Sequence, residues 1–235
     1  MYSCLSPCII IPNFYEIVFL KLVLCYTKFG EKTRYIKEIV SNQIDIDKSI
    51  FIALLYPISE QEDILECLND AKVKYPKANH YCHASILGET GEHQSASDDG
   101  EPSRTAGIPI LEVLKHHDVT NICCVVIRYF GGIKLGAGGL VRAYTKACAD
   151  AIKLAKFYQM KLVPVFKITF DYEKINLIEK TFEKDANVIE KTYLEFVSYT
   201  IILTDQKIER IDEIQHLLKN VEDLGFKTIH IDESL

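Results

Sequence analysis

An apolar run that stops at a cluster of glycines is the strongest constraint on how this chain can fold. Residues 121–130, NICCVVIRYF, have the composition of a buried strand, and an amphipathic helix is expected from about 139 to 158. Between them, the glycine segment, residues 131–139, holds five glycines. Because glycine permits positive φ and close backbone approach, this segment indicates either a special turn or a ligand that approaches bare backbone.

Other strands and helices surround this unit. The pattern predicts strands at 48–58 and 79–88, a helix at 59–76 with Ser59 and Glu62 in a capping box, a long loop at 89–107 and a short helix at 108–117. Beyond residue 160 the expected elements are a strand, a helix, two strands, a helix and a strand. This β-α-β-β-α-β order is typical of the ferredoxin-like fold, so we predict an α+β chain with domains at 31–160 and 161–235.

Residues 1–30 are expected to form an extension outside these domains, either disordered or absent from the native protein. The stretch is apolar but carries Pro12, Glu16 and Lys21, so it is too interrupted for a membrane span, and no basic leader precedes it. The eight cysteines show neither a disulfide framework nor zinc spacing, which favours free thiols in a reducing compartment. We therefore expect a cytoplasmic protein without membrane contact.

The glycine segment is a candidate phosphate site. It is not a Walker loop, because the Gly-Lys-Ser/Thr ending is missing, and it lacks the third glycine of a dinucleotide fingerprint. The N–H groups at a helix N-terminus nevertheless favour phosphate. A tight turn packed under the sheet remains an equally good interpretation.

Cations concentrate around the glycine segment. Between Arg128 and Lys156 there are six Lys and Arg residues and one acid, Asp150, although the whole chain has a formal net charge of −6. A solvated helix surface is the alternative to a polyanion site. Phosphate contacts of this kind give affinity without sequence readout, so no reading of DNA sequence is expected. The candidate phosphate or RNA site comprises Arg128, Tyr129, Gly131, Gly132, Lys134, Gly136, Gly138, Gly139, Arg142 and Lys146.

The acidic loop, residues 98–105, allows three interpretations. Its candidate residues are Asp98, Asp99, Glu101, Arg104 and Thr105. The carboxylates could hold a hard cation such as Mg2+, or act as acid and base, although no paired nucleophile is present. We favour an Asx-type turn for Asp98 and Asp99, with acids that pair with Arg128 or Arg104. No catalytic residue, metal or cofactor is assigned.

Two long motifs resemble the signature of the IMPACT/YigZ family. They are SASDDGEPSRTAGIPILEVL, residues 95–114, and VVIRYFGGIKLGAGGLVRAY, residues 125–144, and the resemblance runs from about Lys48 to the C-terminus. It implies a first domain similar to the second domain of a small-subunit ribosomal protein, and a second similar to the last domain of elongation factor G. Eukaryotic relatives control translation initiation by interfering with activation of a stress kinase. Arg104 stands where the family usually has glycine, so it would strain the loop if φ there is positive, or add a cation if the loop meets phosphate.

Three functional hypotheses follow. The first is a non-enzymatic regulator of translation that binds RNA, the ribosome or a translation factor through the basic glycine-segment face. The second is an enzyme acting on a phosphorylated small molecule or nucleotide, with a metal held by the acidic loop. The third is a protein-interaction module.

Overall fold

The computed structural model describes residues 33–183, 186–203 and 209–233. The expectations for residues 1–30 lie outside the described residues. The chain forms two compact units: the first ends at Gln159 and resumes at Asp232, and the second is Met160–Ile231. Within the described part of the chain, no helix is both long enough and apolar enough to cross a membrane.

An antiparallel sheet forms the centre of the first unit. Two of its inner strands are apolar along almost their whole length, as strands buried on both faces are. In spatial order the strands are β2 (Val40–Ile46), β3 (Ser49–Pro57), β6 (Ile122–Tyr129), β4 (His80–Leu87) and β5 (His93–Ser97).

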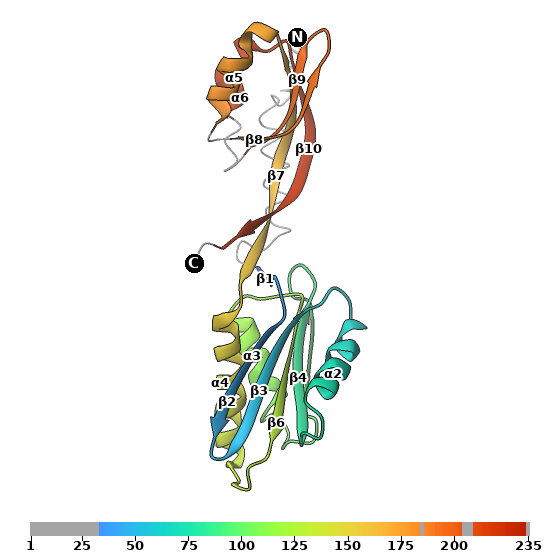
Figure 1. The fold of residues 1–235 in the computed structure, drawn as a ribbon, viewed down its shortest axis with the longest axis vertical. Coiled ribbons are helices and arrows are strands. Elements are labelled where there is room, and N and C mark those ends of the chain that lie inside the picture. Colours follow the sequence, from blue (N-terminus) through green and yellow to red (C-terminus); the bar gives the residue numbers. More distant parts are fainter. Residues whose placement is uncertain (1–32, 184–185, 204–208, 234–235) are drawn as a thin grey trace, which may run out of the picture. The chain divides into compact units, whose positions relative to one another are not determined.

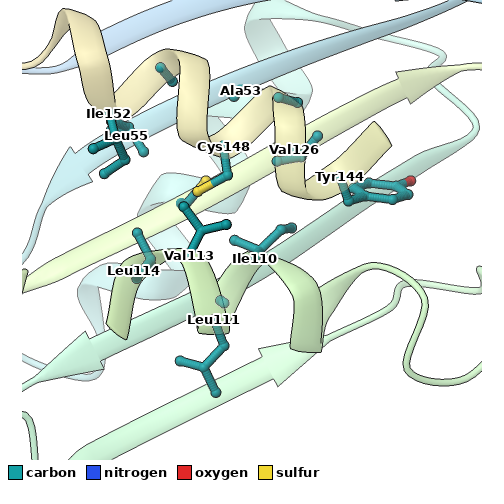
Figure 2. Packing of buried hydrophobic residues seen from close by; sticks show 14 of the residues in the cluster. Ala53, Leu55, Ile110, Leu111, Val113, Leu114, Val126, Tyr144, Cys148 and Ile152 are labelled. Atoms are coloured by element: carbon teal, nitrogen blue, oxygen red, sulfur yellow. The ribbon is translucent and has the colours of Figure 1, made fainter. Parts of the chain in front are cut away.

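Helices cover both faces of this sheet. α2 (Asp63–Lys74) packs on one face, and α3 (Gly107–His116) and α4 (Gly136–Leu154) pack on the other (Figure 1). Figure 2 shows side chains of α3 and α4 gathered between the two helices and the sheet, among them Val113 and Cys148. The sheet is packed on both faces by these apolar layers, and close packing positions the ends of its strands, from which the loops start.

The second unit follows the expected order of elements. It contains β7 (Phe157–Phe170), α5 (Ile175–Phe182), β8 (Ala186–Tyr193), β9 (Val197–Leu203), α6 (Glu209–Ile214) and β10 (Asn220–Asp232). β7 lies between β9 and β10, and β8 pairs with β9. The first residues of β7 belong to the first unit, where they pair with β1 (Arg34–Ile36). The mixed helix and strand composition is confirmed, whereas the likeness of either unit to a ribosomal-protein, elongation-factor or ferredoxin-like fold stays a prediction.

Two local predictions in the first unit were wrong. β5 lies inside the segment 89–107, which was expected to be a loop. The strand was not predicted because its sequence, HQSAS, is mostly exposed and has no apolar alternation; it is held by backbone pairing with β4. α2 begins at Asp63 without the Ser59 and Glu62 capping box. Its first turn is instead joined to the preceding chain by Asp63, whose Oδ2 accepts the N–H and Oγ–H of Ser59.

The limits of the glycine-segment helix also differ from the prediction. α4 begins at Gly136 and ends at Leu154, so three of the five glycines lie within its first turn. Glycine is a poor helix former, which is why the pattern alone moved the predicted start towards residue 139.

Candidate functional site

The acidic loop and the glycine segment meet at one end of the first unit's sheet. β6 leads into the glycine segment, and Arg128 near its end pairs across the sheet with His80, the first residue of β4. The guanidinium of Arg128 donates from Nη1 to Oε1 of Glu101 in the acidic loop, over 2.6 Å. Only 6% of the Arg128 side chain and 4% of the Glu101 side chain are exposed. A buried ion pair therefore joins the two motifs.

A tyrosine from α4 completes this ion pair. The Tyr144 hydroxyl donates to the same Glu101 oxygen over 2.8 Å, and the Cys82 thiol lies 3.3 Å from that hydroxyl. Burial raises the pKa of Tyr144 far above its usual value, and the neighbouring Cys82 and Glu101 add to the shift. Burial likewise raises the pKa of Cys82 to about 12. Both groups therefore stay protonated near neutral pH, and Cys82 is not a thiolate nucleophile.

Aromatic rings enclose the Arg128 guanidinium. Its central carbon lies 5.3 Å from the ring centre of Phe51 and 5.4 Å from that of Phe130. Arg128 was predicted as a phosphate contact, and its burial against Glu101 and these rings contradicts that role. The residue instead fixes the end of β6, from which the glycine segment starts.

Asp98 caps the N-terminus of α3. Its Oδ1 accepts the backbone N–H groups of Ala106 and Gly107 over 3.0 and 2.9 Å, and its Oδ2 accepts that of Arg104 over 2.7 Å. Burial opposes ionisation of this carboxyl, but these N–H donors prevail and lower its pKa. Asp98 thus accepts N–H groups six to nine residues along the chain, whereas an Asx-type turn would use the backbone two residues on, and Glu101, not an aspartate, pairs with Arg128.

Asp99 and Thr105 of the acidic loop also bond within the protein. Asp99 Oδ2 accepts the N–H of Tyr81 over 2.6 Å, and its carbonyl oxygen lies 2.8 Å from Nδ1 of His80. Thr105 donates its hydroxyl to the carbonyl of Pro102. Among the residues that the structure describes, no three His, Cys, Asp or Glu side chains are grouped as metal ligands would be. These internal bonds disfavour a metal held by the acidic loop.

Arg104 adopts the backbone conformation that favours glycine. Its φ is +64°, in the left-handed region, where a side chain costs about 1–2 kcal/mol. The side chain is exposed, and within the described residues it makes no ion pair. The strain foreseen from the sequence is therefore present.

Replacing Arg104 with glycine is expected to raise the free energy of unfolding by up to about 1 kcal/mol, because relief of the strained φ outweighs the added chain entropy of glycine. Urea denaturation measures the change. Arg104→Ala, which keeps the strain and removes the charge, is the matched control and should not stabilise. If both variants raised the free energy of unfolding equally, Arg104 would destabilise the protein through its charge and not through backbone strain.

Backbone geometry accounts for several glycines of the predicted site. Gly132 and Gly136 have φ values of +87° and +67°, and both lie in open surroundings. Gly139 lies over Leu135, whose Cβ a side chain at 139 would approach to 2.9 Å. Gly138 has no such neighbour. The turn interpretation thus covers most of these glycines and leaves Gly138 without a structural reason.

The exposed cations of the site are fewer than the sequence indicated. On α4, Lys146 and Lys153 both pair with Asp150, over 2.6 and 2.8 Å. Lys134 and Arg142 are exposed, and the described residues offer neither of them an acidic partner. Tyr129 is half-buried and donates its hydroxyl to the Pro76 carbonyl. We call the exposed side chains of Lys134, Arg142 and Lys146 the basic surface.

Sequence reasoning missed the polar roles of Tyr144 and His80. Tyr144 is buried on α4, where its hydroxyl needs an acceptor that the spacing of residues could not identify. Ser49 was also missed: its Oγ accepts the N–H of Gly131 over 3.2 Å. The burial of a tyrosine hydroxyl was the one available signal.

Comparison with known proteins gives matches over most of the chain. Residues 47–152 match the family model described as the Impact N-terminal domain. The chain is 36% identical to IMPACT family member YvyE of Bacillus subtilis, over 79% of this chain and 86% of that protein. It is 32% identical to IMPACT family member YigZ of Escherichia coli, over 70% of this chain and 82% of the relative. A crystal structure of a hypothetical protein matches with a TM-score of 0.52 and 27% identity, covering 83% of this chain and 97% of that one.

Proposed function

Because the chain belongs to the IMPACT family, we propose that it is a cytoplasmic regulator of translation that binds RNA, or a ribosomal or translation-factor component, through its basic surface. Family membership supports the general role in translation, which the resemblance implies for eukaryotic relatives. The basic surface supports the mode of binding.

One observation carries the proposal: Lys134 and Arg142 are exposed and have no acidic partner among the described residues, in a chain whose formal net charge is −6. Over most of its surface, a protein with net negative charge repels the phosphates of RNA. Two uncompensated cations at the glycine segment give a local attractive field, and phosphate responds to that local field. Lys146, half neutralised by Asp150, extends it along α4.

The backbone around the basic surface supports phosphate binding as well. The first turn of α4, from Gly136 to Gly139, has no side-chain cap, and most of it is exposed. Its N–H groups and the positive end of the helix dipole favour an anion beside Lys134 and Arg142. The buried Arg128–Glu101 pair holds the strand end beneath the segment, so these groups stay in place without a ligand.

Reversing the charge of Arg142 and Lys146 together is expected to weaken RNA binding at least tenfold at low salt. Each lost phosphate contact also lowers the dependence of log K on log[salt] by roughly 0.7–0.9, so the double variant should show a shallower salt dependence. Fluorescence anisotropy of labelled RNA, titrated at several salt concentrations, measures both quantities.

The matched control reverses two exposed lysines elsewhere in the first unit, Lys72→Glu with Lys77→Glu, and so changes the net charge equally. It should lose far less affinity than the Arg142/Lys146 variant. If both variants lost the same affinity for RNA, the change in net charge alone would explain the loss. If the unaltered protein bound no RNA at low salt, the proposal would fail, and capture of a protein partner after nuclease treatment would then test the interaction-module alternative.

A further inference from the structure

Phe130 is a large apolar side chain held at the surface beside the basic surface. It follows β6 directly and is 45% exposed. Its backbone is fixed, because its N–H donates to Oδ1 of Asn79 over 2.8 Å. Single exposed apolar residues are common, so exposure alone says little. The surroundings of this ring are more informative.

The inner side of the Phe130 ring contacts a buried cation. The Arg128 guanidinium lies 5.4 Å from the ring centre and is held by Glu101 over 2.6 Å. A cation over an aromatic ring attracts its π-electrons, which restricts how the ring can turn. Phe130 therefore presents an exposed ring to solvent while the same ring contacts the buried guanidinium.

Two exposed lysines, Lys48 and Lys134, lie on backbone segments next to Phe130. Lys134 follows it in the glycine segment. Lys48, in the turn between β2 and β3, lies next to Gly131, since a Cβ built at Gly131 would be 1.9 Å from the Lys48 carbonyl oxygen. Ile133, 42% exposed, adds apolar surface in the same segment. An acidic residue, Asp47, is also exposed in the same turn, directly before Lys48.

An exposed aromatic ring near exposed cations is a combination that binds unstacked bases and their phosphates. Duplex RNA hides its base faces within the stack, whereas a single strand offers every base as a stacking partner. We propose that Phe130 is a stacking platform for a base and that the RNA bound at the basic surface is single-stranded, with phosphates held by Lys48 and Lys134. This inference rests on the proposed function and specifies its ligand.

The chain contains no tryptophan, so Phe130→Trp in the full-length protein places its only indole at the proposed platform, where it can be excited selectively over the tyrosines. An oligouridylate of about twelve nucleotides should quench its emission on binding, because a stacked base lies against the indole. An RNA duplex of the same length should not. Tyr172→Trp, at an aromatic of similar exposure (48%) in the second unit, is the control and should remain unquenched.

Affinity provides the second measurement. Phe130→Ala should weaken binding of the single strand about tenfold or more and leave its salt dependence unchanged, because the lost contact is not a phosphate contact. Phe130→Tyr should retain the affinity, and Phe130→Leu should not, since leucine restores apolar surface without a ring. Thermal melting of each variant checks the fold.

The outcomes separate the two proposals. Suppose that the unaltered protein binds RNA with the expected dependence on Arg142 and salt. If Phe130→Ala then binds equally well, or the indole of the Phe130→Trp variant is not quenched at saturation, the stacking platform is refuted and the proposed function stands. Preference for duplex over single strand would refute it too. If no RNA binds at low salt, both proposals fail.

Discussion

Replacing Arg128 with methionine is expected to lower the free energy of unfolding by about 3–5 kcal/mol, the usual cost of leaving one partner of a buried ion pair uncompensated. Methionine preserves much of the length of the side chain, so packing against Phe51 and Phe130 changes little. What remains is a Glu101 carboxylate with 4% exposure, a hydrogen bond from the Tyr144 hydroxyl, and the more distant Nε2 of His80 at 4.0 Å. Urea denaturation of the full chain, followed by circular dichroism, measures the loss.

An exposed ion pair in the same unit supplies the control. Lys115 and Glu112 on α3 lie 2.9 Å apart, with side-chain exposures of 44% and 60%. Lys115→Met should cost less than about 1 kcal/mol, because water screens the pair and solvates the remaining carboxylate. The contrast between the arginine variant and the lysine variant isolates the effect of burial.

A double variant tests whether the penalty belongs to the pair. Arg128→Met with Glu101→Leu removes both charges, so its cost should be well below the sum of the two single variants. If Arg128→Met alone cost less than about 1 kcal/mol, or if the costs simply added, the pair would not be the link that joins the acidic loop to β6.

The sequence predicted the parts of the fold that have strong periodicity. The apolar runs of β3, β4 and β6 and the amphipathic pattern of α3 each gave the correct element, because burial on one or both faces dictates residue type directly. β1 and β2 were not predicted. β2 has the sequence VSNQIDI and lies at the edge of its sheet with no fully buried residue, so its identity depends on pairing with β3.

The candidate site was predicted less completely than the fold. The two motifs that form it were both recognised, and pairing of a loop acid with Arg128 or Arg104 was considered, yet Arg128 was also counted among the phosphate contacts and Glu101 was only one of several acids. Which acid meets which arginine depends on a loop conformation in which Asp99 and Arg104 both have positive φ, at +41° and +64°. Non-glycine residues rarely adopt this conformation, so neither composition nor spacing reveals it.

Glycine clusters are ambiguous in sequence for a related reason. The same residues serve a close backbone contact, a positive φ, or an approaching ligand, and only the neighbours in space distinguish these uses. For Gly131 the structure predicts that an added side chain lowers stability, and for Gly138 it predicts that an added side chain does not. Substitutions at these two positions therefore test whether the glycines serve a packed turn or an approaching ligand.

Replacing Gly131 with alanine is expected to destabilise the first unit by about 3 kcal/mol, as overpacking against rigid backbone does. The added Cβ would lie 1.9 Å from the Lys48 carbonyl oxygen and 2.6 Å from the Ser49 nitrogen, and no side-chain rotation can relieve a clash with main chain. The shift would also break the bond from the Gly131 N–H to Ser49 Oγ. Thermal and urea denaturation measure the loss.

Gly138→Ala is the matched control within the same segment. A Cβ there meets only Nη1 of Arg142, at 3.7 Å, which is ordinary contact, and alanine favours the helix, so stability should rise by up to about 1 kcal/mol. If Gly131→Ala instead left stability unchanged but weakened RNA binding, close approach of a ligand, not packing against the Lys48 turn, would explain that glycine. A loss of RNA affinity in the stabilised Gly138→Ala variant would assign the ligand-facing role to Gly138, the one glycine of the segment for which neither packing nor a positive φ gives a reason.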